Sequence, residues 1–239
     1  DAQPYCYYSN QLTLSGDGKR LLTGGQYNDN QRFRCYFWDY DESSATWGGY
    51  DASGNFVLNK PYHIYKSGGN WGYGGIRLTM SLDGKRFGFS NYTSASAGRA
   101  GVMFYSDETH EWGRMGVDGT ITTAHTGDGN GGTTDHWNLD MSGITAHYGM
   151  RSKMCGNGST FIVGSYHNNG HGAVVAWHFN EETYEWGMYN TDGSFTTTMD
   201  KNRMYKSATG NHYAYWMDIT ADGKTIVAWG HNGTAGKVY

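Results

Sequence analysis

The side chains that could do chemistry in this chain form no recognised catalytic or metal-binding motif. The ten histidines are scattered and include no His-Glu-x-x-His pair, the arrangement that holds catalytic zinc. There is no Gly-x-Ser-x-Gly elbow for acyl transfer, and the glycine-rich stretch 127–132 is not closed by the Lys-Ser/Thr of a phosphate loop. The sequence therefore predicts that the chain is not an enzyme and has neither a metal site nor a cofactor.

Two weaker patterns keep chemistry open as an alternative. His167 and His171 flank Asn-Asn-Gly, and His231 recurs at the position of His167, so these imidazoles are either metal ligands or polar loop residues. Sugar hydrolysis needs two carboxylates that can be distant in sequence. The aspartates without another explanation are Asp135, Asp140, Asp200 and Asp218.

The three cysteines, Cys6, Cys35 and Cys155, are too few for a disulfide scaffold, and their odd number leaves at least one unpaired. Cys6 and Cys35 both lie in expected strands of the first repeat and form the candidate disulfide. Buried free thiols are the equal alternative.

Composition excludes some partners. The chain has 239 residues with 37 Gly, 2 Pro and 16% aromatics, which indicates many tight turns between short strands. A net charge of −4 without a basic block argues against nucleic acid. No apolar run is long enough for a membrane-spanning helix, so no membrane insertion is expected.

Three sequons, at Asn91, Asn157 and Asn232, fall in expected turns or loops, where N-glycans can be accommodated. The chain opens at Asp1 without Met, which fits either a processed secreted protein or a start inside a longer chain. We therefore expect an extracellular or cell-surface location.

A repeat organises these residues. The segment 12–39 reads as strand, Asp-Gly turn, strand, polar loop and strand, and it recurs at 78–105, 152–177 and 217–239. Asp17-Gly18 is expected to form a two-residue hairpin turn. The tryptophans Trp47, Trp112 and Trp186 keep a fixed place in their units, and we expect them to pack between blades.

Four short strands per repeating unit predict an all-β fold, a β-propeller forming one domain over residues 1–239. Its units are about 9–58, 74–122, 148–198 and 213–239, with residues 1–8 supplying the strand that the fourth unit lacks. Such a propeller would have four blades of four antiparallel strands, closed by the N-terminal segment. The alternative is that the chain is an excerpt of a larger propeller.

The motif Ser-x-Asp-Gly-Lys-Arg, followed by a short Asn/Gly loop, an aromatic strand and a tryptophan, resembles integrin-α/FG-GAP-like propeller repeats. The likeness is strongest to tandem-repeat cell-surface proteins of algae and marine microbes. It is carried by 15–21 with 36–47, 81–87 with 104–112, and 221–226. The resemblance implies Ca²⁺ in an Asp/Asn-rich loop, for which 28–30 is the nearest candidate. That loop lacks the alternating aspartates that supply several oxygens, so Ca²⁺ stays only an alternative.

Long connections at 59–72, 122–147 and 196–212 should gather on one face with the loops 27–31, 91–99, 167–172 and 231–236, and loops often carry function. The candidate ligand or partner residues on this face are Tyr27, Asn28, Asp29, Tyr62, Trp71, Trp137, His167 and His231. Their rings either contact a partner or only hold the loops in place.

The sequence predicts a non-catalytic extracellular structural or interaction module, a building block of a cell-surface or filament assembly. Its partners would be other protein subunits, including copies of itself. A lectin-like propeller that binds glycans is the alternative, and a glycoside hydrolase is the lesser one.

Overall fold

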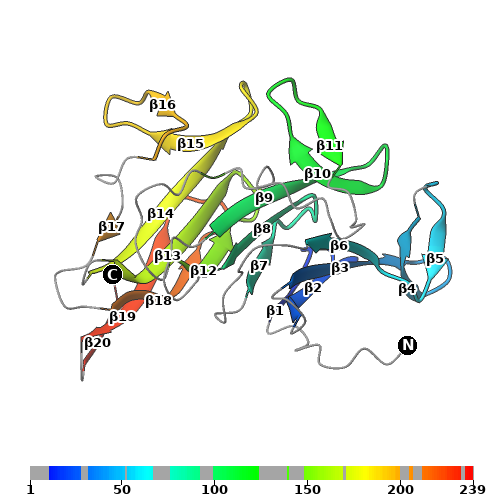
Figure 1. Ribbon diagram of the computed structural model, residues 1–239, viewed down its shortest axis with the longest axis horizontal. Helices are drawn as coiled ribbons and strands as arrows, with labels where there is room; N and C mark the ends of the chain where they lie inside the picture. Colours follow the sequence, from blue (N-terminus) through cyan, green and yellow to red (C-terminus); the bar gives the residue numbers. More distant parts are fainter. Residues whose placement is uncertain are drawn as a thin grey trace.

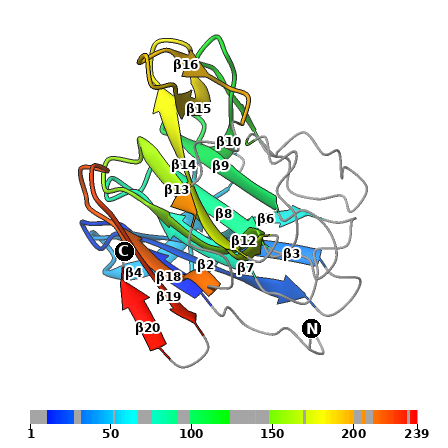
Figure 2. The same ribbon diagram turned by 90° about the vertical axis from the view of Figure 1, so that its left-hand side faces the viewer.

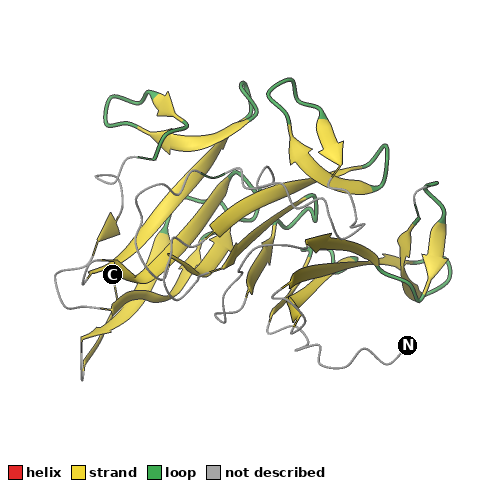
Figure 3. Cartoon of the chain, viewed as in Figure 1, coloured by secondary structure: helices red, strands yellow, loops and turns green. Residues whose placement is uncertain are grey.

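The computed structural model describes residues 11–27, 32–51, 53–66, 76–91, 99–123, 139, 148–168, 171–199, 205–206, 212–232 and 235–238. Within these ranges the regular structure is entirely β-strand, as Figure 3 shows, and no helix could span a membrane. The strands form four antiparallel sheets in chain order, numbered here one to four. Figure 1 shows them side by side, with sheet one on the right and sheet four on the left.

The first two sheets come from the first half of the chain. Sheet one contains β1 (Gln11–Leu14), β2 (Arg20–Tyr27), β3 (Arg32–Asp41), β4 (Thr46–Tyr50) and β5 (Phe56–Leu58), with β6 (Tyr62–Lys66) paired to β3. Sheet two contains β7 (Ile76–Met80), β8 (Arg86–Asn91), β9 (Arg99–Ser106), β10 (Glu111–Met115) and β11 (Ile121–Thr123).

The other two sheets repeat the pattern. Sheet three contains β12 (Tyr148–Met154), β13 (Thr160–Asn168), β14 (His171–Asn180), β15 (Glu185–Tyr189) and β16 (Phe195–Thr196), with β17 (Tyr205–Lys206) paired to β14. Sheet four contains β18 (His212–Ile219), β19 (Ile226–Asn232) and β20 (Ala235–Val238). Figure 2 views the series from the side of sheet four.

The turn that joins the first two strands of each sheet is longer than the expected two-residue hairpin. Leu14 pairs with Leu21, and the N–H of Ser15 donates to the carbonyl of Arg20 at 2.8 Å, so four residues bridge the strands. Only Gly18 takes a positive φ, of 73°. Asp17 acts through its side chain instead, because its carboxylate accepts hydrogen bonds within the turn.

Apolar side chains fill each junction between neighbouring sheets. Leu22, Cys35 and Phe37 of sheet one pack on Phe87 and Trp112 of sheet two, with the Phe37 and Trp112 ring centroids 4.5 Å apart. A third cluster joins sheets three and four. The sheets therefore pack face to face in series, as the blades of a propeller do.

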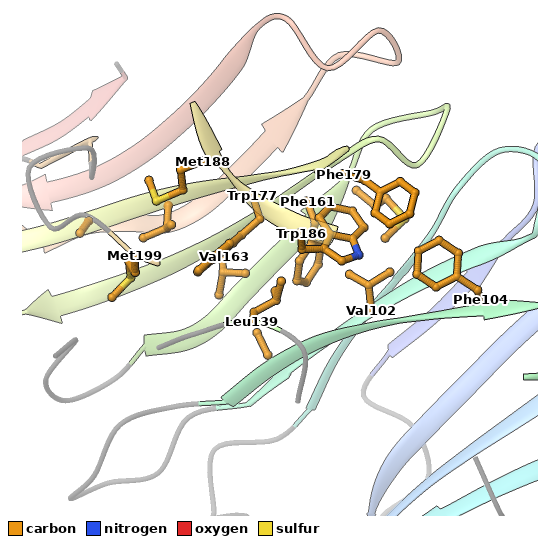
Figure 4. Close-up of a cluster of buried hydrophobic side chains, with 14 residues drawn as sticks. Val102, Phe104, Leu139, Phe161, Val163, Trp177, Phe179, Trp186, Met188 and Met199 are labelled. Carbon is orange, nitrogen blue, oxygen red and sulfur yellow. The ribbon is translucent and has the colours of Figure 1, made fainter. Parts of the chain in front are cut away.

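The largest cluster lies between sheets two and three (Figure 4). Val102 and Phe104 from β9 meet Phe161 and Trp186 from sheet three. Gly88 makes this approach feasible, since a Cβ there would lie 2.3 Å from a ring carbon of Phe161. Trp112 and Trp186 are both buried, which confirms that they pack between blades, whereas Trp47 of sheet one is only half-buried.

The all-β propeller-type fold predicted from the repeat is thus confirmed, while the number of blades and ring closure stay predictions. Residues 1–8, expected to close the ring, lie outside the described residues. Two of the expected long connections are partly strand, because β6 lies within 59–72 and β17 within 196–212. The alternation of Tyr62 and Ile64 with polar residues is the strand signal that the repeat comparison passed over.

Candidate functional site

The polar groups at the turn end of the sheets serve as anchors between blades. Arg20 donates from Nε to Asp39 at 2.6 Å and from Nη1 to the carbonyl of Gly84 at 2.9 Å. Its guanidinium carbon lies 3.7 Å from the centroid of the Tyr105 ring. Because Gly84 and Tyr105 belong to sheet two, this arginine ties sheet one to its neighbour.

The same anchor recurs one blade later. Arg86 donates from Nη2 to Glu181 at 2.7 Å and from Nη1 to the carbonyl of Gly158 at 3.4 Å. Its guanidinium lies 4.7 Å from the centroid of the Phe179 ring. The Asp-Gly-Lys-Arg motif is therefore a structural device that joins consecutive sheets.

Two ionisable groups at this end have shifted pKa values with a structural cause. Burial raises the pKa of Asp39, and the neighbouring Arg20 partly opposes the shift. Burial also raises the pKa of Tyr105, whose hydroxyl lies 3.0 Å from Nδ1 of His110. The His110 ring stacks on Tyr50 at 4.1 Å between centroids. These acids and rings are engaged with one another, so we do not place a reaction here.

The opposite end of the sheets is called here the exit end. It lies where the second strand of each sheet connects to the third. In sheet three, Asn168 at the end of β13 pairs with His171 at the start of β14. In sheet four, His212 at the start of β18 pairs with His231 near the end of β19. With His167 in β13, four histidine positions lie toward the exit end of two neighbouring sheets.

A guanidinium from the first strand of sheet three contacts the first strand of sheet four. Arg151 of β12 lies 4.7 Å over the ring of Trp216 in β18. Lys153, two residues further along β12, forms an ion pair with Asp218 at 3.6 Å. Arg151 thus brings a positive charge to the inner strands of sheets three and four, while the charge of Lys153 is paired.

The structure places the predicted site residues in different settings. Tyr27 ends β2 opposite Arg32, at the exit end of sheet one. His167 and His231 lie in strands close to that end rather than in loops. Tyr62 begins β6 opposite Phe37, inside the sheet, so its expected place in a long loop is wrong. Asn28, Asp29, Trp71 and Trp137 lie outside the described residues, and so does the candidate Ca²⁺ loop.

The sequons and cysteines are partly placed. Asn157 is exposed in the turn between β12 and β13, while Asn91 and Asn232 are the last residues of β8 and β19. Glycosylation at all three stays a prediction. Cys35 is a fully buried free thiol whose pKa is raised by burial, and its proposed partner Cys6 lies outside the described residues.

Sequence reasoning did not consider Arg151, treated His171 only as a metal ligand or a polar loop residue, and did not predict that His212 pairs with His231. The pairing of His212 with His231 depends on strand register, which no motif encodes. Among the residues whose side chains the structure describes, no group of three or more His, Cys, Asp or Glu could hold a metal ion.

Comparison with known proteins gives fold relatives only. No family model matches the chain, and no curated protein matches it. Among solved structures, hydrazine synthase from Kuenenia stuttgartiensis is 12% identical with a TM-score of 0.47, over 97% of this chain and 58% of its own.

Two further matches carry the names of lactonases. The periplasmic gluconolactonase of Pseudomonas aeruginosa is 13% identical with a TM-score of 0.44, over 95% of this chain and 54% of its own. A putative 6-phosphogluconolactonase of Bacteroides fragilis is 14% identical with a TM-score of 0.39, again over 95% and 54%. The chain thus spans little more than half the length of these structures.

This comparison corrects two predictions. The chain was expected to be a non-catalytic structural module and not an enzyme, whereas the matched propellers are enzymes by name. The prediction failed because it rested on missing local motifs. A propeller gathers residues from several blades at one end, so a reactive group needs no sequence neighbour to act with. At these identities the likeness is one of fold, and it assigns no reaction to this chain.

Proposed function

We propose that the chain is a hydrolase of the propeller type, acting at the exit end of sheets three and four on a small polar ester. The observation that carries the proposal is the placement of four histidine positions from β13, β14, β18 and β19 toward one end of two packed sheets. Histidine is the side chain whose ordinary pKa best suits proton transfer near neutral pH.

The proposed reaction needs a base and a site for negative charge. A neutral imidazole takes a proton from water as the water oxygen attacks the ester carbonyl carbon. The carbon–oxygen bond to the leaving alkoxide then breaks, and the imidazolium returns the proton to that alkoxide. One water is consumed, and a cyclic ester yields a hydroxy acid.

Arg151 would supply the positive charge. Its guanidinium lies on the inner strand of sheet three beside Trp216 of sheet four. A fixed guanidinium stabilises the oxyanion of the transition state and the carboxylate of the product. The half-buried setting of Arg151 strengthens both interactions relative to bulk water.

We take the first test substrates from the names of the matched structures. The intact 239-residue protein is assayed with gluconolactone, and with a simple unsubstituted lactone as the comparison. Rates are taken above spontaneous hydrolysis from pH 5 to 8. We expect enzymatic turnover of gluconolactone that falls on the acid side as an imidazole is protonated.

Two histidine variants locate the reaction. His231→Gln or His171→Gln should lower kcat/KM by about a hundredfold, the size of a lost general base. His110→Asn is the matched control at the turn end, because His110 has a φ of 56° that asparagine tolerates. Hydrolysis no faster than in buffer, or equal losses in all three variants, would contradict the proposal.

A further inference from the structure

Every junction inside the molecule joins the same two kinds of face. The front face of a sheet packs on the sheet before it in the chain, and the back face packs on the sheet after it. Leu78 and Met80 on the front face of sheet two are buried against Leu22 and Phe37 on the back face of sheet one. Within the described residues, no sheet packs on the front face of sheet one or on the back face of sheet four.

The open front face of sheet one can be compared with the equivalent, covered face of sheet two. Leu12 and Leu14 occupy the repeat positions of Leu78 and Met80, in the sequences LTLSGDG and LTMSLDG. Leu78 and Met80 are 4% and 6% exposed, whereas Leu12 and Leu14 are 71% and 47% exposed. Sheet one therefore has large aliphatic side chains at the positions that form a junction in sheet two, although no described sheet packs on them.

The open back face has the same character. Val227 occupies the repeat position of Leu22 and Ile162, which are both fully buried, yet Val227 is 46% exposed.

A ladder of backbone hydrogen bonds ends at the same two places. The N–H of Gly16 donates to the carbonyl of Leu82 at 2.7 Å, and Leu82 donates in the same way to Gly156 at 2.7 Å. Gly156 then donates to Ala221 at 2.9 Å. These four residues hold one repeat position in the four turns. Within the described chain, the carbonyl of Gly16 and the N–H of Ala221 are the two ends of the ladder without a partner.

We propose that a second copy of this chain covers both faces. The back face of sheet four in each copy packs on the front face of sheet one in the other, and Ala221 N–H donates to Gly16 across the contact. The new junction continues the three junctions already described, with the same apolar positions and the same backbone bond. A second copy brings one face of each kind, so two copies use all four open faces.

The result is a closed two-fold ring with eight sheets. A front-to-back contact generates a ring if the rotation closes and a filament if it does not. Eight blades lie within the range that propellers usually adopt. This inference concerns assembly and stands independently of the proposed hydrolysis.

The test measures mass in solution by light scattering after size exclusion, over a wide range of protein concentrations. The wild-type chain is expected at twice its own mass. Leu14→Lys and Val227→Lys should each weaken association by about a hundredfold or more, since a charge would be buried in the contact. Val117→Lys is the matched control, because Val117 is 74% exposed in the β10–β11 turn, away from both faces.

A mixing experiment gives a sharper readout. Each of the two Lys variants keeps one intact face, so an equal mixture can form one unaltered contact and should recover one-to-one pairs that neither variant forms alone. Ala221→Pro removes only the ladder donor, at a turn position that accepts proline, and should also weaken the dimer. Circular dichroism confirms that each variant is folded.

Three results would overturn the inference. These are a single copy at every concentration, a dimer that survives both Lys substitutions, and a growing series of larger species that never settles at two copies.

Discussion

At the scale of single residues, the turn aspartates do structural work through their carboxylates. Asp17 accepts from Ser15 Oγ at 2.6 Å and from the N–H of Lys19 at 3.0 Å. Asp222 accepts from Thr220 Oγ1 at 2.6 Å and from the N–H of Lys224 at 3.1 Å. The hydroxyl hydrogen bond is the largest cause that lowers the pKa of each aspartate, and the backbone bond adds to it.

This arrangement predicts acid sensitivity. A carboxyl with a lowered folded-state pKa stabilises the fold above its unfolded pKa of about 3.9, and that stability is lost as pH falls through the folded pKa. Asp39 has a raised pKa and acts in the opposite sense. The contribution of a turn aspartate is therefore measured separately, with the Asp222→Asn variant. The wild type should exceed this variant in urea midpoint by more at pH 7 than at pH 3. An equal difference at both pH values would contradict the prediction.

The third turn shows that an amide can fill the same place. Asn157 Oδ1 accepts from the N–H of Ser159 at 3.0 Å, and the N–H of Thr160 donates to Cys155 Sγ at 3.0 Å. Cys155 and Asn157 thus replace the Ser and Asp of the other turns with the geometry retained. Asp222→Asn should therefore preserve the turn while removing the charge.

At the scale of elements, the turns are joined to one another as well as closed within themselves. In the turn of sheet two, the N–H of Gly84 donates to the carbonyl of Ser81 at 3.0 Å and closes the turn. The N–H of Leu82, in the same turn, donates instead to the carbonyl of Gly156 in the next sheet. The local turn and the bond between sheets therefore depend on different backbone groups, and they can be separated by one substitution.

Leu82→Pro makes that separation. Proline is favoured at the second position of such a turn, so the turn is kept while the donor to Gly156 is removed. We expect a loss of about 1 kcal/mol in the free energy of unfolding, the net value of one hydrogen bond, measured by urea denaturation. Ala221→Pro in dilute protein is the control. If both variants lost the same stability, the bond between sheets would not be the cause.

The sequence predicts these elements well where chemistry is local. Gly18, Gly84, Gly158 and Gly223 were expected at the turns, and all four have positive φ values between 69° and 73°. The expected burial of Trp112 follows from its fixed place in the repeat. Such features can be predicted because a turn or a packing position is set by neighbours in the chain and by the repeat itself.

The candidate site could not be predicted in the same way. The pairing of His212 with His231 and the stacking of Arg151 on Trp216 depend on strand register and on contact between sheets. β6 was missed because it pairs with β3 across the β4–β5 hairpin rather than with its chain neighbour. Long-range pairing of this kind leaves no local pattern.

At the scale of the whole molecule, the sheets differ in how much of them is covered. Sheets two and three are packed on both faces, and Phe87, Phe161 and Ile162 in β8 and β13 are fully buried. Sheet four is packed on one face only, with Ala228 buried and Val227 exposed.

This asymmetry predicts an order of hydrogen exchange. In dilute protein, amides of β8 and β13 should exchange slowest and those of β19 fastest among these strands, because opening a sheet covered on one face exposes less apolar surface. Exchange followed by mass spectrometry of proteolytic fragments resolves the three strands. Equal protection in β8 and β19 of the Val227→Lys variant would contradict the expected order.

The two described cysteines are buried at the first and the last junction between the sheets. Cys35 is sealed between sheets one and two, and Cys155 lies fully buried where a Cβ on Gly223 of the fourth sheet would come within 3.4 Å. A thiol reagent reaches either sulfur only after the blades beside it part. The modification rates of the two residues therefore report separately on the opening of the first and the last junction.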